Sequence, residues 1–178
     1  MFGITPVHLH LLLNHIPVIG SMGSVLLLIY AMARNNAELK RAALIACVLT
    51  GLAAYATDYT GDGAEHVAKQ ISGINRQDIS AHAKAGDTAM DVSLVLGAVA
   101  LFGLILAWNK KGGEQTIGDY IRHHKEPHRW IMIACLVIGL ADIYFVSIAA
   151  YKGGLIRHPE IQAGYQSPAV SNPTPSGQ

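Results

Sequence analysis

Four long apolar stretches dominate the chain and predict four membrane-spanning helices. No Asp, Glu, Lys or Arg interrupts residues 1–33, 42–57 or 92–109, and Asp142 alone interrupts 130–151. A helix that crosses the hydrocarbon of a bilayer needs about 20 mostly apolar residues. A helix of a soluble bundle would instead carry a polar stripe along one face. We therefore expect an all-α fold, an integral membrane four-helix bundle.

The ends of these helices are predicted from prolines, glycines and capping residues. Thr5-Pro6 is a typical helix start. Pro17 lacks a backbone donor, so the first helix should kink near Leu13. The Gly153-Gly154 pair is expected to end the last helix. The predicted helices span about 6–33, 39–59, 78–108 and 130–151 of a transmembrane domain over 1–161, and the Pro- and Ser-rich tail 162–178 is expected to be disordered.

Basic residues are unevenly divided between the two ends of the predicted bundle. The loops after the first and third helices carry eight: Arg34, Lys40, Arg41, Lys110, Lys111, Arg122, Lys125 and Arg129. The termini and the 58–78 connection carry four: Lys69, Arg76, Lys152 and Arg157. Because loops rich in Lys and Arg stay in the cytoplasm, both termini are expected on the outer side. In a bacterium this is the periplasmic face of the inner, cytoplasmic membrane.

Composition narrows the classes of function. Only 14% of the residues are charged, against roughly 25% in average soluble domains, and a net charge of +1 gives no reason to expect nucleic acid as a partner. Cys47 and Cys135 lie in apolar stretches without a CxxC or CxxCH motif, which argues against a disulfide framework and c-type haem. No nucleophile with its base, P-loop or dinucleotide fingerprint is recognisable. The sequence thus favours an electron-transfer component over a stand-alone enzyme.

Six of the nine histidines fall at the outer end of the predicted bundle: His8, His10, His15, His66, His82 and His158. Ionisable groups near membrane depth are costly and mark candidate functional sites. Neutral imidazole is a common ligand for haem iron and for Zn or Cu. The histidine-rich outer end is therefore the candidate site.

His15 and His82 are the preferred ligands within this set. The kink at Pro17 can aim His15 into the bundle, whereas His10 lies on a different face of the same helix. His82 is followed on its own face by the small residues Gly86, Ala89, Ser93 and Gly97. Such a stripe leaves room for a flat macrocycle, and it equally serves close helix packing. Measured along straight helices at about 1.5 Å per residue, His82 lies higher than His15 and closer to the level of His8.

Carboxylates add further candidates. Asp62 followed three residues later by Glu65 matches a helix capping box, and Glu65 is also a candidate metal ligand. Asp91 and Asp142 lie within the third and fourth predicted helices. They could serve a proton path, although a buried carboxylate hydrogen-bonded to Ser or Tyr is the preferred interpretation.

Four short motifs, in order along the chain, resemble those of a known family. They are His10-x4-His15-x-Pro17, Thr60-Gly61-Asp62-Gly-Ala64-Glu65, Ile79-Ser-Ala-His82 and Gly153-Gly154-Leu-Ile-Arg157-His158. Together they resemble a family of four-helix bacterial inner-membrane proteins long catalogued as a domain of unknown function. The resemblance covers nearly the whole chain except the tail. It implies a membrane domain associated with respiratory or redox proteins, with b-type haem as the expected cofactor, and it singles out His10, His15, His82 and His158.

The leading hypothesis is a membrane b-type haem protein or subunit for electron transfer. The haem would lie in the outer half of the bundle, with His15 and His82 as axial ligands and Gly86 beside it. His10 and His158 would hold a second haem or, with Arg157, a propionate. The expected partners are the lipid bilayer and a redox protein or larger respiratory complex.

Three other classes stay open. An outer-face Cu or Zn site for sensing, delivery or transport would use five ligands: His10, His15, His82, His158 and Glu65. A structural subunit of a respiratory complex would use the polar outer end as an interface. A small proton-coupled transporter would use Asp91 and Asp142.

Overall fold

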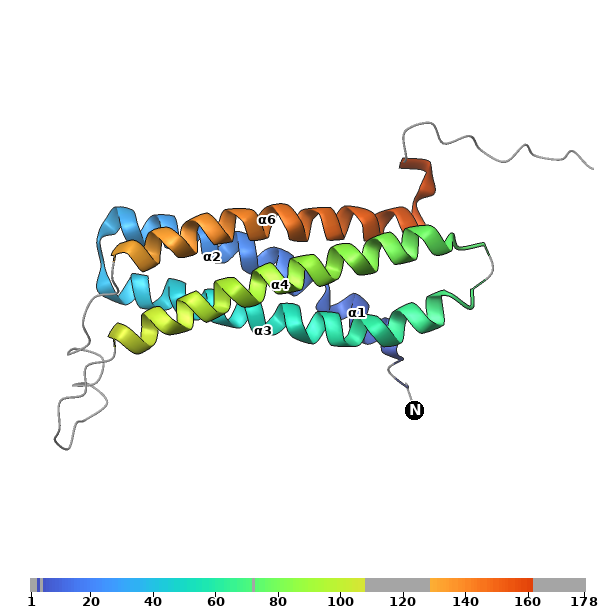
Figure 1. The fold of residues 1–178 in the computed structure, drawn as a ribbon, viewed down its shortest axis with the longest axis horizontal. Helices are drawn as coiled ribbons and strands as arrows, with labels where there is room; N and C mark the ends of the chain where they lie inside the picture. The colour runs from blue at the N-terminus through green and yellow to red at the C-terminus, as the bar shows by residue number, and fades with distance from the viewer. Residues whose placement is uncertain (1–2, 4, 72, 108–128, 162–178) are drawn as a thin grey trace, which may run out of the picture.

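The computed structural model describes residues 3, 5–71, 73–107 and 129–161, and all of its regular elements are helical. With labels as in Figure 1, these are α1 (Pro6–Leu13), α2 (His15–Arg34), α3 (Ala37–Ala68), α4 (Arg76–Ala107), α6 (Arg129–Arg157) and the short 3₁₀ helix η1 (Pro159–Ile161). The predicted tail lies outside the described residues. So do the three remaining histidines, His123, His124 and His128.

The break between α1 and α2 confirms the predicted kink. The Thr5 side chain accepts a hydrogen bond from the His8 backbone N–H and starts α1. The helix is interrupted at Asn14, three residues before Pro17. Because Pro17 has no N–H, the carbonyl of Leu13 loses its helical partner. The Thr57 hydroxyl of α3 lies 3.2 Å from that carbonyl oxygen and donates to it.

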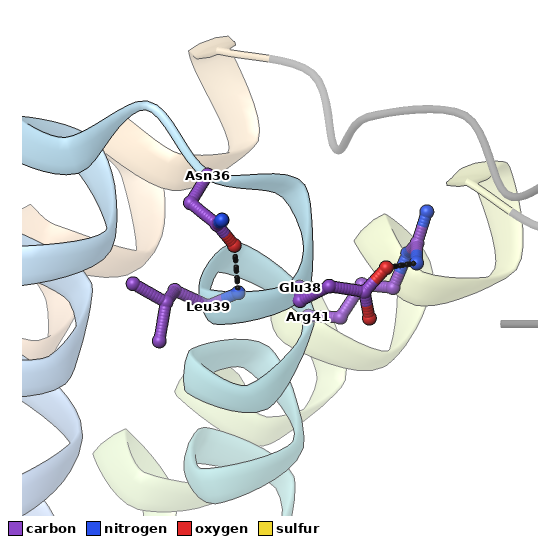
Figure 2. A network of polar contacts seen from close by, with 4 residues as sticks. All are labelled: Asn36, Glu38, Leu39 and Arg41. Atoms are coloured by element: carbon purple, nitrogen blue, oxygen red, sulfur yellow. Dashed lines mark hydrogen bonds and ion pairs between the residues drawn. The ribbon is translucent and has the colours of Figure 1, made fainter. Parts of the chain in front are cut away.

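A tight turn reverses the chain between α2 and α3. Asn35 adopts a left-handed conformation at φ 45°, which asparagine tolerates better than most residues. The Asn36 side chain then caps α3 by accepting from the Leu39 N–H at 2.9 Å, and Glu38 pairs with Arg41 at 2.9 Å (Figure 2). An N-terminal cap and an i, i+3 ion pair both favour a helix that begins here.

Two helices are longer than the glycine pattern predicts. The second span continues to Ala68 instead of ending near residue 59, and the fourth continues through Gly153-Gly154 to Arg157. Asp62 and Glu65 therefore lie inside α3, and the predicted capping box is wrong. The glycines serve close contact: a Cβ on Gly63 would lie 3.0 Å from Pro6 of α1. Packing across the bundle thus outweighs the weak helix propensity of glycine.

The helices form a bundle in which α2 and α4 each pack against both α3 and α6. The interior combines apolar side chains such as Leu28, Leu44 and Leu96 with small and polar residues, among them Ser21, Ser24, Thr50 and Ser93. Large apolar side chains also point outward, as at Leu12, Ile19 and Leu26, each about two-thirds exposed. Buried hydroxyls between closely packed helices and an apolar exterior are typical of helices that pack within lipid.

Four helical segments are long and apolar enough to cross a membrane: Pro6–Arg34, Ala37–Ala68, Arg76–Ala107 and Arg129–Arg157. The chain thus has the architecture of a multi-pass membrane protein. Figure 1 places the start of α1, the α3–α4 connection and the end of α6 at one end of the bundle. The α2–α3 turn lies at the other end. The end of the bundle at which α1 begins and α6 ends is called the histidine end below. It holds His8, His10, His66, His82 and His158.

Candidate functional site

Two histidines from different spans meet at the histidine end. The rings of His10 in α1 and His82 in α4 lie with their centroids 6.2 Å apart and their planes at 72°. Both side chains are half-buried. The structure thus brings His82 together with His10, in keeping with the height at which straight helices place it.

Each of the two imidazoles is held by a backbone carbonyl of a further helix. His10 Nδ1 lies 3.0 Å from the carbonyl oxygen of Thr57 in α3, and His82 Nδ1 lies 3.0 Å from that of Ala149 in α6. A carbonyl oxygen only accepts, so in each ring Nδ1 is the nitrogen that donates. In a neutral imidazole Nε2 then carries the free lone pair. This arrangement fixes both the ring orientation and the tautomer, as it does for many metal-bound histidines.

Glycines let both rings fit between the helices. A Cβ on Gly153 of α6 would lie 3.0 Å from Cε1 and 3.2 Å from Nδ1 of His82. A Cβ on Gly61 of α3 would lie 3.3 Å from Cε1 of His10. Both glycines belong to the motifs singled out in the sequence. Their structural role is to make space for the imidazoles.

A carboxylate lies near each of the two imidazoles. Glu65 is close enough to His82 for its charge to act on the imidazole, and it pairs with Lys69 at 2.5 Å. Asp58 is close enough to His10 for their charges to interact. Three other carboxylates, Asp62, Asp87 and Asp91, act on Asp58 in the opposite sense. Among the residues that the structure describes, no group of three His, Cys, Asp or Glu side chains is arranged to hold a metal ion. The donor set of the site is therefore a pair of imidazoles.

The other predicted ligands lie apart from this pair. His15 is exposed at the start of α2, and no hydrogen bond or ring contact joins it to another described side chain. Gly86 has open space where a Cβ would be. Arg157 is exposed at the end of α6.

His158, the last of the predicted ligands, is bound locally. Its Nδ1 lies 2.9 Å from Oε1 of Glu160, and both side chains are exposed. The backbone N–H of Glu160 and the His158 side chain lower the pKa of the Glu160 carboxyl below its ordinary value. A group with a lowered pKa keeps its stabilising contact at neutral pH and loses it in acid.

The two carboxylates considered for a proton path have opposite surroundings. Asp142 is fully buried, and the hydroxyls of Ser21 and Ser93 lie 2.6 Å from its two oxygens. This confirms the preferred interpretation of a buried carboxylate bonded to serine. Asp91 is exposed and borders an open apolar hollow between α4 and α6, lined by Val92, Val95, Val137, Ile138 and Ala141.

Comparison with protein-family models, with curated proteins and with solved structures finds no match to this chain. The resemblance to the four-helix membrane family therefore stays a prediction. The carbonyl acceptors of Thr57 and Ala149 were missed because backbone groups carry no residue-type signal. Ser21 and Ser93 were detectable in principle as hydroxyls within apolar stretches.

Proposed function

We propose that this protein is a membrane b-type haem protein of the electron-transfer class, in which His10 and His82 are the axial ligands. One observation carries the proposal: two half-buried imidazoles from different spans lie with their ring centroids 6.2 Å apart, and each donates its Nδ1 hydrogen to a backbone carbonyl. This proposal assigns to His10 the role that the sequence-based hypothesis assigned to His15. Ligands from facing helices are a usual arrangement in bundles that hold a cofactor.

The distance between the two ring centres is compatible with both imidazoles binding one metal centre. With each metal–nitrogen bond about 2 Å long and each ring centre about 1 Å further, a straight nitrogen–metal–nitrogen axis separates the centres by about 6 Å. The observed separation is 6.2 Å. A tetrahedral angle at the metal would bring the centres to about 5 Å.

The number of ligands favours haem over a bare metal ion. A porphyrin supplies four nitrogens, so haem iron needs only two protein ligands. A structural zinc site takes four, and a catalytic one takes three. The described residues offer the pair of imidazoles and no group of three. Gly86 lies one turn of α4 from His82, and a Cβ there would meet nothing within 4 Å. This leaves space for a flat group beside the His82 ring.

Haem bound in this way would supply one-electron redox chemistry, because ligation by two histidines closes both axial positions to oxygen. The protein's part is to fix the two rings through Thr57 and Ala149. The excess of Lys and Arg in the opposite loops supports placing the histidine end at the periplasmic face of the inner membrane. A redox protein or a larger respiratory complex would be the partner there.

The test is the absorption spectrum of protein purified in detergent from cells that make other b-type haem proteins. We expect a Soret band and a reduced α-band. His10→Ala and His82→Ala should each abolish haem retention, because one axial ligand is lost. His8→Ala is the matched control, since His8 lies in the same helix but is exposed and bonded to Thr5.

Three outcomes would contradict parts of the proposal. A colourless preparation overturns haem binding, and metal analysis of the same sample then tests the Cu or Zn alternative. Full haem retention in both site variants shows that the ligands are wrong. Loss of haem in His15→Ala together with retention in His10→Ala would restore the pair expected from the sequence.

A further inference from the structure

A chain of hydrogen bonds links three spans in the middle of the bundle. Ser21 in α2 bonds the carbonyl oxygen of Pro17 at 2.7 Å and Oδ2 of Asp142 at 2.6 Å. Ser93 in α4 bonds Oδ1 of Asp142 at 2.6 Å. The side chains of Ser21, Ser93 and Asp142 are all fully buried.

Counting hydrogens assigns the direction of these bonds. The Ser21 hydroxyl carries one hydrogen but has two close partners. The carbonyl of Pro17 has no hydrogen to give, so that contact uses the hydrogen of Ser21. If Asp142 were ionised, Ser21 would have to share this one hydrogen with Oδ2 of Asp142. A protonated Asp142 gives the 2.6 Å contact a hydrogen of its own.

The surroundings of Asp142 agree with a neutral acid. It lies 13 residues from one end of α6 and 15 from the other, roughly 20 Å from each at 1.5 Å per residue. The ion pairs found among the described residues do not include it. Its titratable neighbour is the buried thiol of Cys47. An unpaired charge at this depth is strongly disfavoured.

We propose that Asp142 is a proton-binding site in the membrane core, a neutral carboxylic acid that clamps the kinked first span to α4 and α6. It donates through Oδ2 to Ser21 and accepts through Oδ1 from Ser93. The Ser21 hydroxyl in turn donates to the carbonyl oxygen of Pro17, the residue whose missing N–H causes the kink. Ser21 lies in α2, eight residues after the end of α1, the helix that carries His10. The proposal does not depend on whether His10 and His82 hold haem.

Infrared spectroscopy of the full chain in detergent or lipid tests the protonation state. We expect the C=O stretch of a protonated carboxylic acid at neutral pH, shifted by exchange into deuterium oxide and missing from Asp142→Asn. Asparagine keeps one donor and one acceptor in the same shape. If the wild type and Asp142→Asn show no difference in this band, Asp142 is ionised and the proposal is wrong.

A second variant keeps the test decisive if Asp142→Asn does not fold. Ser21→Ala removes the acceptor of the acid's hydrogen, so the band should move to higher frequency and the thermal midpoint should fall. Ser147→Ala is the matched control because Ser147 is an exposed serine of α6. A Ser21→Ala protein with the band and thermal midpoint of Ser147→Ala would overturn the clamp.

Discussion

At the scale of single residues, the site depends on which nitrogen of each imidazole carries the hydrogen. His10 and His82 each give their Nδ1 hydrogen to a carbonyl of another helix. Those carbonyls belong to α3 and α6, so each ring is held by a helix other than its own. A small displacement of one helix would therefore turn a ring away from its partner.

Gly153 allows a direct test of this dependence. In Gly153→Ala the new methyl would lie 3.0 Å from Cε1 of His82, tighter than ordinary contact. Overpacking of this kind costs about 1–3 kcal/mol, so we expect haem retention to fall about tenfold or more, measured as the haem-to-protein ratio after purification. Gly154→Ala is the control, because a Cβ there meets nothing within 4 Å. Equal retention in the two variants would contradict the role of Gly153.

At the scale of elements, glycines set how closely the helices approach. Four glycines, one in each span, would place a Cβ within 3.0 Å of a neighbouring helix: Gly20, Gly51, Gly103 and Gly139. In Gly51 the obstacle is the backbone carbonyl of Ser93, which cannot turn aside as a side chain can. The small-residue stripe of α4 is thus used for packing at Ser93 and Gly97. At Gly86 it remains open.

Gly51→Ala should destabilise the bundle by about 1–3 kcal/mol through overpacking between α3 and α4. The measurement is the thermal midpoint in detergent. Gly23→Ala is the control, because its Cβ would meet nothing within 4 Å and alanine favours the helix by up to about 1 kcal/mol. If Gly51→Ala is as stable as Gly23→Ala, the close contact of α3 with α4 is not essential.

At the scale of the whole molecule, the described bundle is apolar on its outside and combines apolar with polar side chains inside. Its core of Leu, Val, Ile, Met and Ala side chains also contains serine and threonine hydroxyls, two thiols and the carboxyl group of Asp142. Many large apolar side chains, among them Leu12, Ile19 and Leu26, are exposed. In water such an apolar exterior would be unfavourable, because the hydrophobic effect buries apolar surface.

The orientation proposed for the bundle rests on the distribution of Lys and Arg, and it can be tested with single introduced cysteines. Gln77→Cys, at the histidine end, should react with a membrane-impermeant thiol reagent added to intact cells. Glu38→Cys, at the other end, should react only after the cells are opened. Cys47 and Cys135 are fully buried, so the signal reports the new residue. The reverse pattern would place the histidine end in the cytoplasm.

The fold was largely predictable from the sequence because each span is an uninterrupted apolar segment, and a long apolar segment in a bilayer has to satisfy its own backbone as a helix. Thr5, Pro6 and Pro17 located the first helix and its kink for similarly local reasons. The ends of α3 and α6 were predicted wrongly because Gly61, Gly63 and Gly153 looked like helix breakers. They are contact points with other spans.

The candidate site was predictable only in part. The sequence by itself determined the four spans, the kink at Pro17 and the gathering of histidines at one end, because these depend on hydropathy and local backbone chemistry. Which histidine meets His82 was decided by the tertiary structure alone. That outcome depends on how α1 leans on α3, how close Gly153 lets α6 approach, and which backbone carbonyls then come within reach of each ring.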